Sequence, residues 1–344
     1  DKMTSTSTFE AYGGRIIRNR EIIRLDAFGY DIEDPESMSP PGAEKFANST
    51  YTKTRRFVLN HHLLFIEGDT VSPLLLSDNE RLLRELPFID DARITVIPVD
   101  SIFADIAVVV REKYPVGMSI RLDDVRSGKL GLYSRNFAGL GHELEISLPY
   151  DFNDYSAPGI ELKYSVRNIA RTFSDLELEF ADGLGTTRAG SIFSRDFVTS
   201  DTKYSWSASA LFINASEDLD TMINPVPLRF VRQDYWGARS FMLDRSNVIR
   251  LILTARYIHN NVFARPEIDD YSYYRLQNYQ FLAGSLAISS QRFINTSLIY
   301  SYGRTEDIPY GYMAEFTVGR EKNEFKFRNY SGVMLSYGNF FNRI

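Results

Sequence analysis

The chain has 344 residues, more than one ordinary domain, so it has room for two parts or for one large β-structure. Its formal net charge of -6 argues against a nucleic-acid partner, because no basic field is available to hold a phosphate backbone. It contains no cysteine and no apolar run long enough for a transmembrane helix, which excludes disulfides, thiolate chemistry and helical membrane spans.

The first part of the chain combines strand and helix patterns. The segment from Gly14 to Phe28 mixes β-branched and charged residues and predicts a strand. Tyr30 to Ser49 contains three prolines and few large apolar residues, which predicts an extended loop. Tyr51 to Phe65 predicts a helix with one buried face. Ser77 to Glu80 has the pattern of a capping box, which predicts the start of a second helix.

Two further strands are predicted after the second helix, from Ala92 to Val99 and from Ile106 to Arg111. The order strand, helix, helix, strand, strand resembles a POTRA domain, the periplasmic unit of the BamA/TamA-like outer-membrane insertase superfamily. This resemblance implies a POTRA-like α+β domain over residues 12–115.

The second part is dominated by an alternation of apolar and polar residues that begins after Pro115. Segments with this alternation are Glu143 to Tyr150, Ile160 to Arg167, Asp175 to Phe180, Tyr204 to Phe212 and Ile249 to Tyr257. About 12 such segments of roughly 9 to 12 residues are predicted, and many end on aromatic residues, as in transmembrane β-barrels. The predicted fold is therefore mainly β, with an antiparallel outer-membrane barrel over residues 116–344.

A soluble β-sandwich is the alternative for this second part, because its strands also alternate. Charged residues on the polar face of the strands are expected to form ion pairs across strands rather than a selectivity filter.

One turn strengthens the resemblance. Lys129 to Leu144 resembles the first barrel hairpin of the insertase superfamily, in which a strand runs into an Asn-Phe-x-Gly-x-Gly turn. Here the turn residues are Asn136, Phe137, Gly139 and Gly141, and the two glycines permit the positive φ angles that let the strands fold back.

Two features depart from this superfamily. Its members that insert or translocate proteins carry an Arg-Gly-Phe or Arg-Gly-Tyr motif, which is absent from this sequence. Their barrels have sixteen strands, more than are predicted here. A C-terminally incomplete piece of a sixteen-stranded barrel is therefore expected, with a true twelve-stranded barrel as the alternative.

The function that the resemblance implies is the assembly or translocation of envelope proteins, with no catalysis, cofactor or metal. The N-terminal domain would lie in the periplasm of a bacterial cell and the barrel in its outer membrane. The implied partners are outer-membrane lipid and unfolded outer-membrane or secreted proteins, with accessory lipoproteins as further candidates. The alternative function is a passive pore or structural barrel with a periplasmic plug domain.

Three groups of residues are candidates for this function. The strand residues expected to accept a client by β-augmentation are Ala92, Ile94, Val96, Ile106, Val108 and Val110. The first barrel strand, expected to form a lateral opening seam, contains Lys129, Leu130, Gly131, Leu132 and Tyr133. The third group is the glycine-containing hairpin turn. The four histidines do not have the spacing of a metal site or a catalytic triad, so no catalytic residue is predicted.

Overall fold

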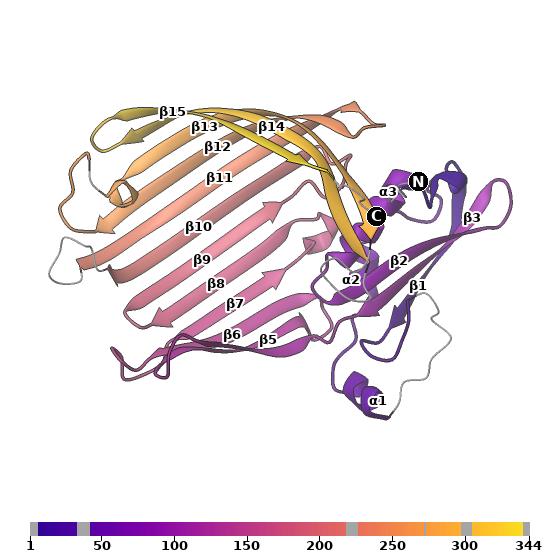
Figure 1. The fold of residues 1–344 in the computed structure, drawn as a ribbon, viewed down its shortest axis with the longest axis horizontal. Helices are drawn as coiled ribbons and strands as arrows, with labels where there is room; N and C mark the ends of the chain where they lie inside the picture. The colour runs from indigo at the N-terminus through magenta and orange to yellow at the C-terminus, as the bar shows by residue number, and fades with distance from the viewer. Residues whose placement is uncertain (1–5, 33–41, 218–225, 272, 297–304, 340–344) are drawn as a thin grey trace.

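The computed structural model describes residues 6–32, 42–217, 226–271, 273–296 and 305–339, which form two sheets (Figure 1). The smaller sheet has three strands, β1 (Ile16–Leu25), β2 (Ile89–Pro98) and β3 (Phe103–Glu112). Their order is β1-β3-β2, with β1 parallel and β2 antiparallel to the central β3. We refer to this sheet and its helices as the N-terminal domain.

Three α-helices belong to the N-terminal domain, α1 (Gly42–Ser49), α2 (Arg56–His61) and α3 (Pro73–Arg84). The capping box predicted at Ser77 to Glu80 is wrong, because these residues lie inside α3 and are buried. The helix begins instead after Ser72, whose hydroxyl accepts a hydrogen bond from the Leu75 amide at 3.5 Å. Pro73 occupies the first turn, where its fixed φ suits a helix and its missing N–H costs nothing.

The extended loop predicted from Tyr30 to Ser49 is also corrected, because its last eight residues form α1. The buried Asn48 holds this helix against the end of β1: its amide nitrogen donates to the Phe28 carbonyl at 2.9 Å, and its oxygen accepts from the Phe28 amide at 3.2 Å. A tertiary contact of this kind stabilises a helix whose sequence has little apolar periodicity. The rest of the predicted loop, residues 33–41, lies outside the described residues.

The core of the N-terminal domain lies between α2 and α3 on one side and the three-stranded sheet on the other. Leu83 of α3 is 0% exposed, and Phe88, directly before β2, is 1% exposed. Each fully buried side chain of this size contributes about 1.5–3 kcal/mol through the hydrophobic effect. The inward-facing residues of β2 and β3 that complete this core are Ala92, Ile94, Val96, Ile106, Val108 and Val110.

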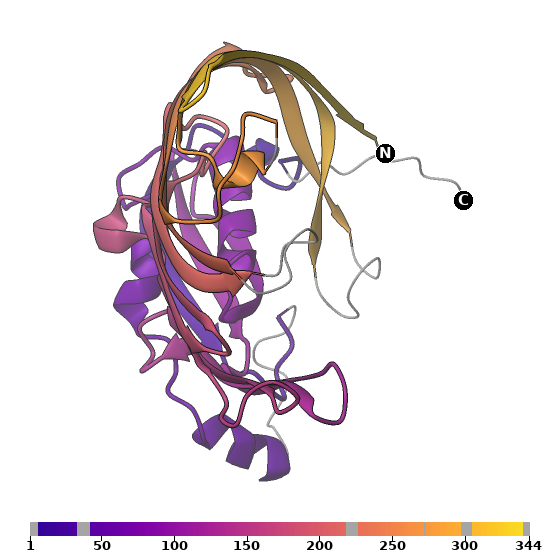
Figure 2. The ribbon, with the colours of Figure 1, turned by 90° about the vertical axis from the view of Figure 1, so that its left-hand side faces the viewer.

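The larger sheet is an antiparallel meander of twelve strands in sequence order, and Figure 2 shows that it curves into an arc. Its strands are β4 (Val116–Leu122), β5 (Ser127–Phe137), β6 (His142–Asp151), β7 (Ile160–Val166), β8 (Asp175–Gly183), β9 (Thr186–Arg195), β10 (Tyr204–Glu217), β11 (Val226–Asp244), β12 (Ile249–Ala264), β13 (Tyr279–Thr296), β14 (Glu306–Asn323) and β15 (Phe327–Gly338). The prediction of a mainly β fold with about 12 strands is confirmed. Several strands are longer than predicted, and β11 reaches 19 residues. Short 3₁₀ turns lie at Glu10–Tyr12, Ile169–Arg171 and Tyr274–Leu276.

The two faces of the larger sheet differ in polarity. The convex face carries exposed apolar side chains, such as Leu132 (61% exposed) and Phe316 (52% exposed). The opposite face carries ion pairs between neighbouring strands: Glu143 with Arg167, Glu179 with Arg188, and Asp234 with Arg256. These pairs confirm that charges of this face associate across strands. Within the described residues, no helix has the length and apolarity needed to cross a bilayer.

Candidate functional site

The N-terminal domain contacts one rim of the larger sheet along a row of successive turns (Figure 1), and we call this contact region the junction. On the domain side it runs from residue 53 through α2 and α3 to residue 91. On the sheet side it comprises, in order, residues 136–141 between β5 and β6, 167–174 between β7 and β8, 196–203 between β9 and β10, and 305–307 at the start of β14. The order of contacts follows the sequence on both sides.

The first contact is made by the glycine-containing turn between β5 and β6. Asn136 is 3% exposed, its side-chain oxygen accepts from the Gly141 amide at 2.7 Å, and its nitrogen donates to the Thr54 hydroxyl at 2.9 Å. The Gly139 carbonyl accepts from the Arg55 amide at 2.9 Å. The turn therefore closes on itself and binds the N-terminal domain with the same residues.

The two glycines of this turn have both a conformational and a packing role. Gly139 and Gly141 have φ angles of +72° and +71°, which favour glycine. A Cβ atom at Gly139 would lie 2.5 Å from the Lys53 carbonyl oxygen, and one at Gly141 would lie 3.0 Å from atoms of Phe88 and Val58. The two glycines thus also fit the turn into the surface of the N-terminal domain. The sequence alone predicted only their role in reversing the strand.

The second and third turns contact α2 and α3. The Asn168 side chain donates to the His61 carbonyl at the end of α2, at 2.7 Å. The Ser200 amide donates to the Asp78 carboxylate at 3.0 Å, and Arg81 donates to the Val198 carbonyl at 3.1 Å. These contacts hold α2 to the rim through a side chain of the second turn, and α3 through backbone groups of the third turn.

Arg84 lies at the centre of the fourth contact. Its guanidinium makes two hydrogen bonds of 2.7 Å to Asp307, one of 2.6 Å to Glu80 and one of 2.9 Å to the Ala92 carbonyl. The side chains of Arg84, Glu80 and Asp307 are only 6%, 11% and 11% exposed. Burial lowers the pKa of Arg84, but the hydrogen bonds and charges of Asp307 and Glu80 outweigh burial and raise that pKa overall. Arg84 therefore stays charged and joins α3, β2 and β14.

For two buried carboxyl groups at the junction, Asp91 and Asp78, burial outweighs the effect of their hydrogen bonds on the pKa. Asp91 accepts hydrogen bonds from the amide and the hydroxyl of Thr305 at 3.3 and 3.2 Å, and Asp78 accepts from Ser200. Burial is the largest effect on both and raises the pKa of each above its usual value. Their ionised forms are therefore disfavoured in the docked state.

We expect a pH dependence of the junction from this raised pKa of Asp78. The unfolded pKa of an aspartate is about 4, so the stabilising effect of the proton is complete below that pH and is lost as the pH rises through the higher folded pKa. Asp78→Asn should remove this pH-dependent contribution to stability. The melting temperature of the variant relative to wild type, measured on the full chain in detergent, should increase from about pH 5 to about pH 8.

Comparing the two proteins at each pH cancels the opposing contribution of His62, whose pKa is lowered by burial. A difference in melting temperature that stays constant with pH would contradict the expected role of Asp78.

For three of the six residues predicted to bind a client, the structure shows that the prediction is wrong. Ile106, Val108 and Val110 lie on β3, which is the central strand of its sheet and is paired on both sides. A strand paired on both sides has no free backbone groups for an added strand, so these residues cannot accept a client by β-augmentation.

The other three predicted residues lie on β2, an edge strand, but part of this edge is covered. The Ile94 amide donates to the Glu80 carboxylate at 2.8 Å, and the Ala92 carbonyl accepts from Arg84. Beyond them no described strand pairs with β2 on the side away from β3. The edge available for pairing is therefore short and runs from Val96 to Pro98, which has no N–H to donate, at the end of the domain far from the large sheet (Figure 1).

The predicted lateral seam is corrected as well. Lys129, Leu130, Gly131, Leu132 and Tyr133 lie on β5, which is hydrogen-bonded to β4 on one side and to β6 on the other. The first strand of the sheet is instead β4, which the sequence reading missed because Asp123 and Asp124 interrupt the alternation after only seven residues. One edge of the described sheet is therefore β4, Val116 to Leu122, and the other is β15.

The charged cluster around Arg84 was not predicted either. Arg84 and Asp307 are 223 residues apart in the sequence, and an Arg in the last turn of a helix has an ordinary role there. Among the described residues, no group of three or more His, Asp or Glu is arranged to hold a metal ion.

No protein-family model and no curated protein sequence matches this chain. Among solved structures, it is similar to BamA from Haemophilus ducreyi lacking POTRA domains 1-3, with a TM-score of 0.36 and 12% identity over 94% of this chain and 79% of that one. It is also similar to CdiB from Acinetobacter baumannii, with a TM-score of 0.40 and 11% identity over 90% of this chain. This chain spans 53% of the CdiB chain. The sequence resembles the BamA/TamA-like superfamily, and a BamA structure is among those to which this chain is similar.

Proposed function

We propose that this chain is an outer-membrane β-barrel protein of the insertase superfamily whose N-terminal POTRA-like domain receives unfolded envelope proteins and delivers them to the barrel. The observation that carries this proposal is the free edge of β2 from Val96 to Pro98, on a domain that is docked to the rim of a sheet with an apolar convex face. An unpaired strand edge adds an extended peptide through main-chain hydrogen bonds, which makes binding tolerant of sequence.

The chemistry around this edge fits an unfolded client. Three aliphatic side chains are exposed where β2 turns into β3: Ile97 (49%), Val99 (42%) and Ile102 (56%). Most surface positions of a soluble domain are polar, so a local group of exposed aliphatic residues next to an open edge is typical of a contact surface. The order β1-β3-β2 with two helices on one face also supports the POTRA-like interpretation.

Depletion of the protein tests the assembly role directly. In a host that depends on it, we expect depletion to lower the amount of at least one other barrel protein in the outer membrane, measured by quantitative proteomics of purified outer membranes. Unchanged levels of all other envelope proteins would refute the assembly role.

Site-specific cross-linking tests the client edge. A photoreactive amino acid in place of Ile97 should form adducts with an unfolded outer-membrane protein, because the side chain lies beside the open part of β2. Ile66 is the matched control, since it is exposed to the same 49% but lies in a turn away from this edge. Adducts should be several-fold more abundant at position 97. Equal yields at the two positions would count against client binding at β2.

A passive pore with a plug domain is the second candidate, and the position of α3 favours it. Asp78, Arg81 and Arg84 of this helix all contact the rim of the curved sheet. A fixed plug would lower conductance without binding any client. Planar-bilayer recordings of the wild type and of a variant with a weakened junction separate the two functions: a large steady conductance that appears only in the variant favours the plug.

A further inference from the structure

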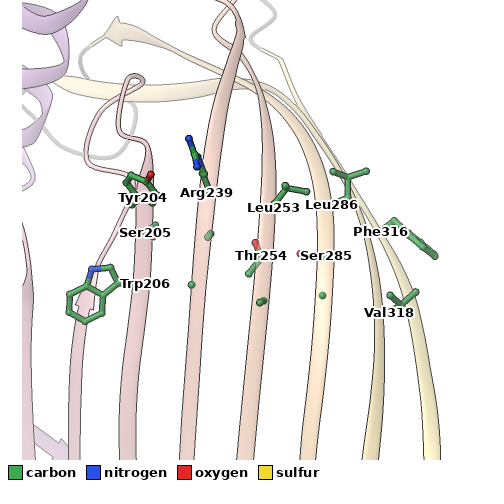
Figure 3. A pocket seen from close by; sticks show the side chains of 14 residues that line it. Tyr204, Ser205, Trp206, Arg239, Leu253, Thr254, Ser285, Leu286, Phe316 and Val318 are labelled. Carbon is green, nitrogen blue, oxygen red and sulfur yellow. The ribbon is translucent and has the colours of Figure 1, made fainter.

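A groove on the convex face of the larger sheet has no role in the proposed assembly function. It has a volume of about 650 Å³ and crosses strands β10 to β14 (Figure 3). Two neighbouring rows of paired residues form it. The first row consists of Tyr204, Arg239, Leu253, Leu286 and Phe316, and the second of Trp206, Gly237, Ala255, Gly284 and Val318.

The floor of the groove contains two glycines that neither the packing nor the backbone conformation of the described residues requires. A Cβ atom at Gly237 would meet no atom within 4 Å, and one at Gly284 would meet only the Thr254 carbonyl oxygen at 3.7 Å, an ordinary contact. Neither glycine is among the residues with positive φ. Glycine within a strand weakens it and often marks a place where a ligand or another backbone approaches closely.

One end of the groove carries an arginine, Arg239, beside apolar lining side chains. The guanidinium carbon of Arg239 lies 5.4 Å from the centre of the Tyr204 ring and 4.8 Å from that of Phe241. Within the described residues no carboxylate forms an ion pair with it. A guanidinium beside aromatic rings at the boundary of an apolar face is suited to an anion from outside the chain, and it binds phosphate through two parallel hydrogen bonds.

The groove also has a defined position relative to the junction. Tyr204 is the first residue of β10, directly after the turn at 196–203 that contacts α3. Arg239 is paired with Tyr204 across the strands, so it lies near the same rim. If the convex face contacts the bilayer, as the proposed function requires, Arg239 lies near the surface of the leaflet on the side of the N-terminal domain.

We propose that this groove binds a phospholipid with a net negative headgroup, with the phosphate at Arg239 and one acyl chain over Gly237, Ala255 and Gly284. Neighbouring strands are about 4.8 Å apart, so the floor and walls from Trp206 to Val318 extend over about 19 Å, which suits an extended acyl chain. The side walls are apolar, and the only charged group of the lining is the cation that a phosphate would neutralise. Charge complementarity therefore favours an anionic lipid over an apolar segment of another protein.

Tryptophan fluorescence provides the test, because the chain has only two tryptophans. Trp206 lines the groove, whereas Trp236 lines a cavity on the opposite face of the sheet. Trp236→Phe leaves Trp206 as the single reporter. The full chain is inserted into phosphatidylcholine vesicles that contain a minor fraction of phosphatidylglycerol with brominated acyl chains, which quench tryptophan on contact.

We expect the brominated phosphatidylglycerol to be enriched at Trp206 by about five-fold over its share of the bilayer, the factor for one arginine near an anionic lipid. In the same background, Arg239→Gln should abolish the enrichment by removing the cation. Gly237→Leu should reduce it by filling the floor.

Two variants on the same convex face serve as controls. Arg320→Gln removes an arginine that stacks on Phe327 in β15, outside the groove, and Ala208→Leu adds bulk beside Trp206 on β10. Both should leave the enrichment unchanged. Quenching in proportion to the lipid mixture in the wild-type groove, or enrichment that survives Arg239→Gln, would overturn the proposal.

Two further outcomes are informative. If Gly237→Leu changes only the oligomeric size of the solubilised protein, the occupant is a second copy of the chain and the lipid proposal is wrong. If brominated phosphatidylcholine alone fails to quench Trp206, the convex face does not contact lipid. That result would refute the proposed membrane function itself, so failure of the two proposals can be told apart.

Discussion

Replacing Arg84 by methionine should destabilise the junction more than any other single change of a charged residue there. The variant leaves Glu80 and Asp307 as buried carboxylates with no cation between them, next to the buried Asp91. Removing one partner from a buried ion pair costs about 3–5 kcal/mol, because the remaining charge has lost its compensation. Chemical denaturation of the full chain in detergent should show a loss of this size.

The destabilisation should have a specific pattern. Burial raises the pKa of Asp91 and the charge of Arg84 lowers it, so removing Arg84 should raise that pKa further and the loss should be smaller at about pH 5 than at about pH 8. The double variant Arg84→Met with Asp307→Asn should recover part of the lost stability, since it removes one of the stranded charges. No recovery in the double variant would mean that the two side chains are not coupled as the 2.7 Å contacts indicate.

Arg18→Met is the matched control for this variant. Arg18 also makes two hydrogen bonds to one aspartate, Asp105, but its side chain is 54% exposed. Water compensates both partners of an exposed pair after one is removed, so stability should change little. A loss equal to that of Arg84→Met would show that burial is not what makes the junction pair important.

Patterns that depend on neighbouring residues could be recognised from the sequence. The alternation of Leu144, Ile146 and Leu148 with polar residues is set by the pleat of a strand, which requires no knowledge of its partners. The same holds for the positive φ of Gly139 and Gly141, which follows from turn chemistry. The number of strands in the larger sheet and the helix–strand order of the N-terminal domain could therefore be predicted from the sequence.

Contacts between distant segments could not be recognised in this way. Glycine at position 139 has the same sequence signature whether it only turns the chain or also accommodates the Lys53 carbonyl. The central position of β3 depends on its parallel pairing with β1, which begins 87 residues earlier at Ile16 beside Phe103. The sequence shows no partner for β1, so it predicts that both β2 and β3 can be edges, and the prediction that Ile106 is open to a client is wrong.

Substituting Gly139 by alanine should release the first turn from the N-terminal domain. The new Cβ atom would lie 2.5 Å from the Lys53 carbonyl oxygen, closer than non-bonded carbon and oxygen atoms approach, and φ of +72° adds strain for any L-residue. Backbone strain of this kind costs about 1–3 kcal/mol before the clash is counted. Hydrogen exchange should reveal it as lost protection of the Arg55 amide, which donates to the Gly139 carbonyl.

A second glycine separates the two causes. Gly68 has φ of +92°, but a Cβ atom there would meet nothing within 4 Å, so Gly68→Ala imposes strain without a clash. We expect Gly68→Ala to lower the melting temperature slightly and to leave the Arg55 amide protected. Gly139→Ala should expose that amide and make the N-terminal domain sensitive to protease while the larger sheet stays intact. If the two variants behave alike, the turn is an ordinary reversal, and docking of the domain does not depend on the glycine motif.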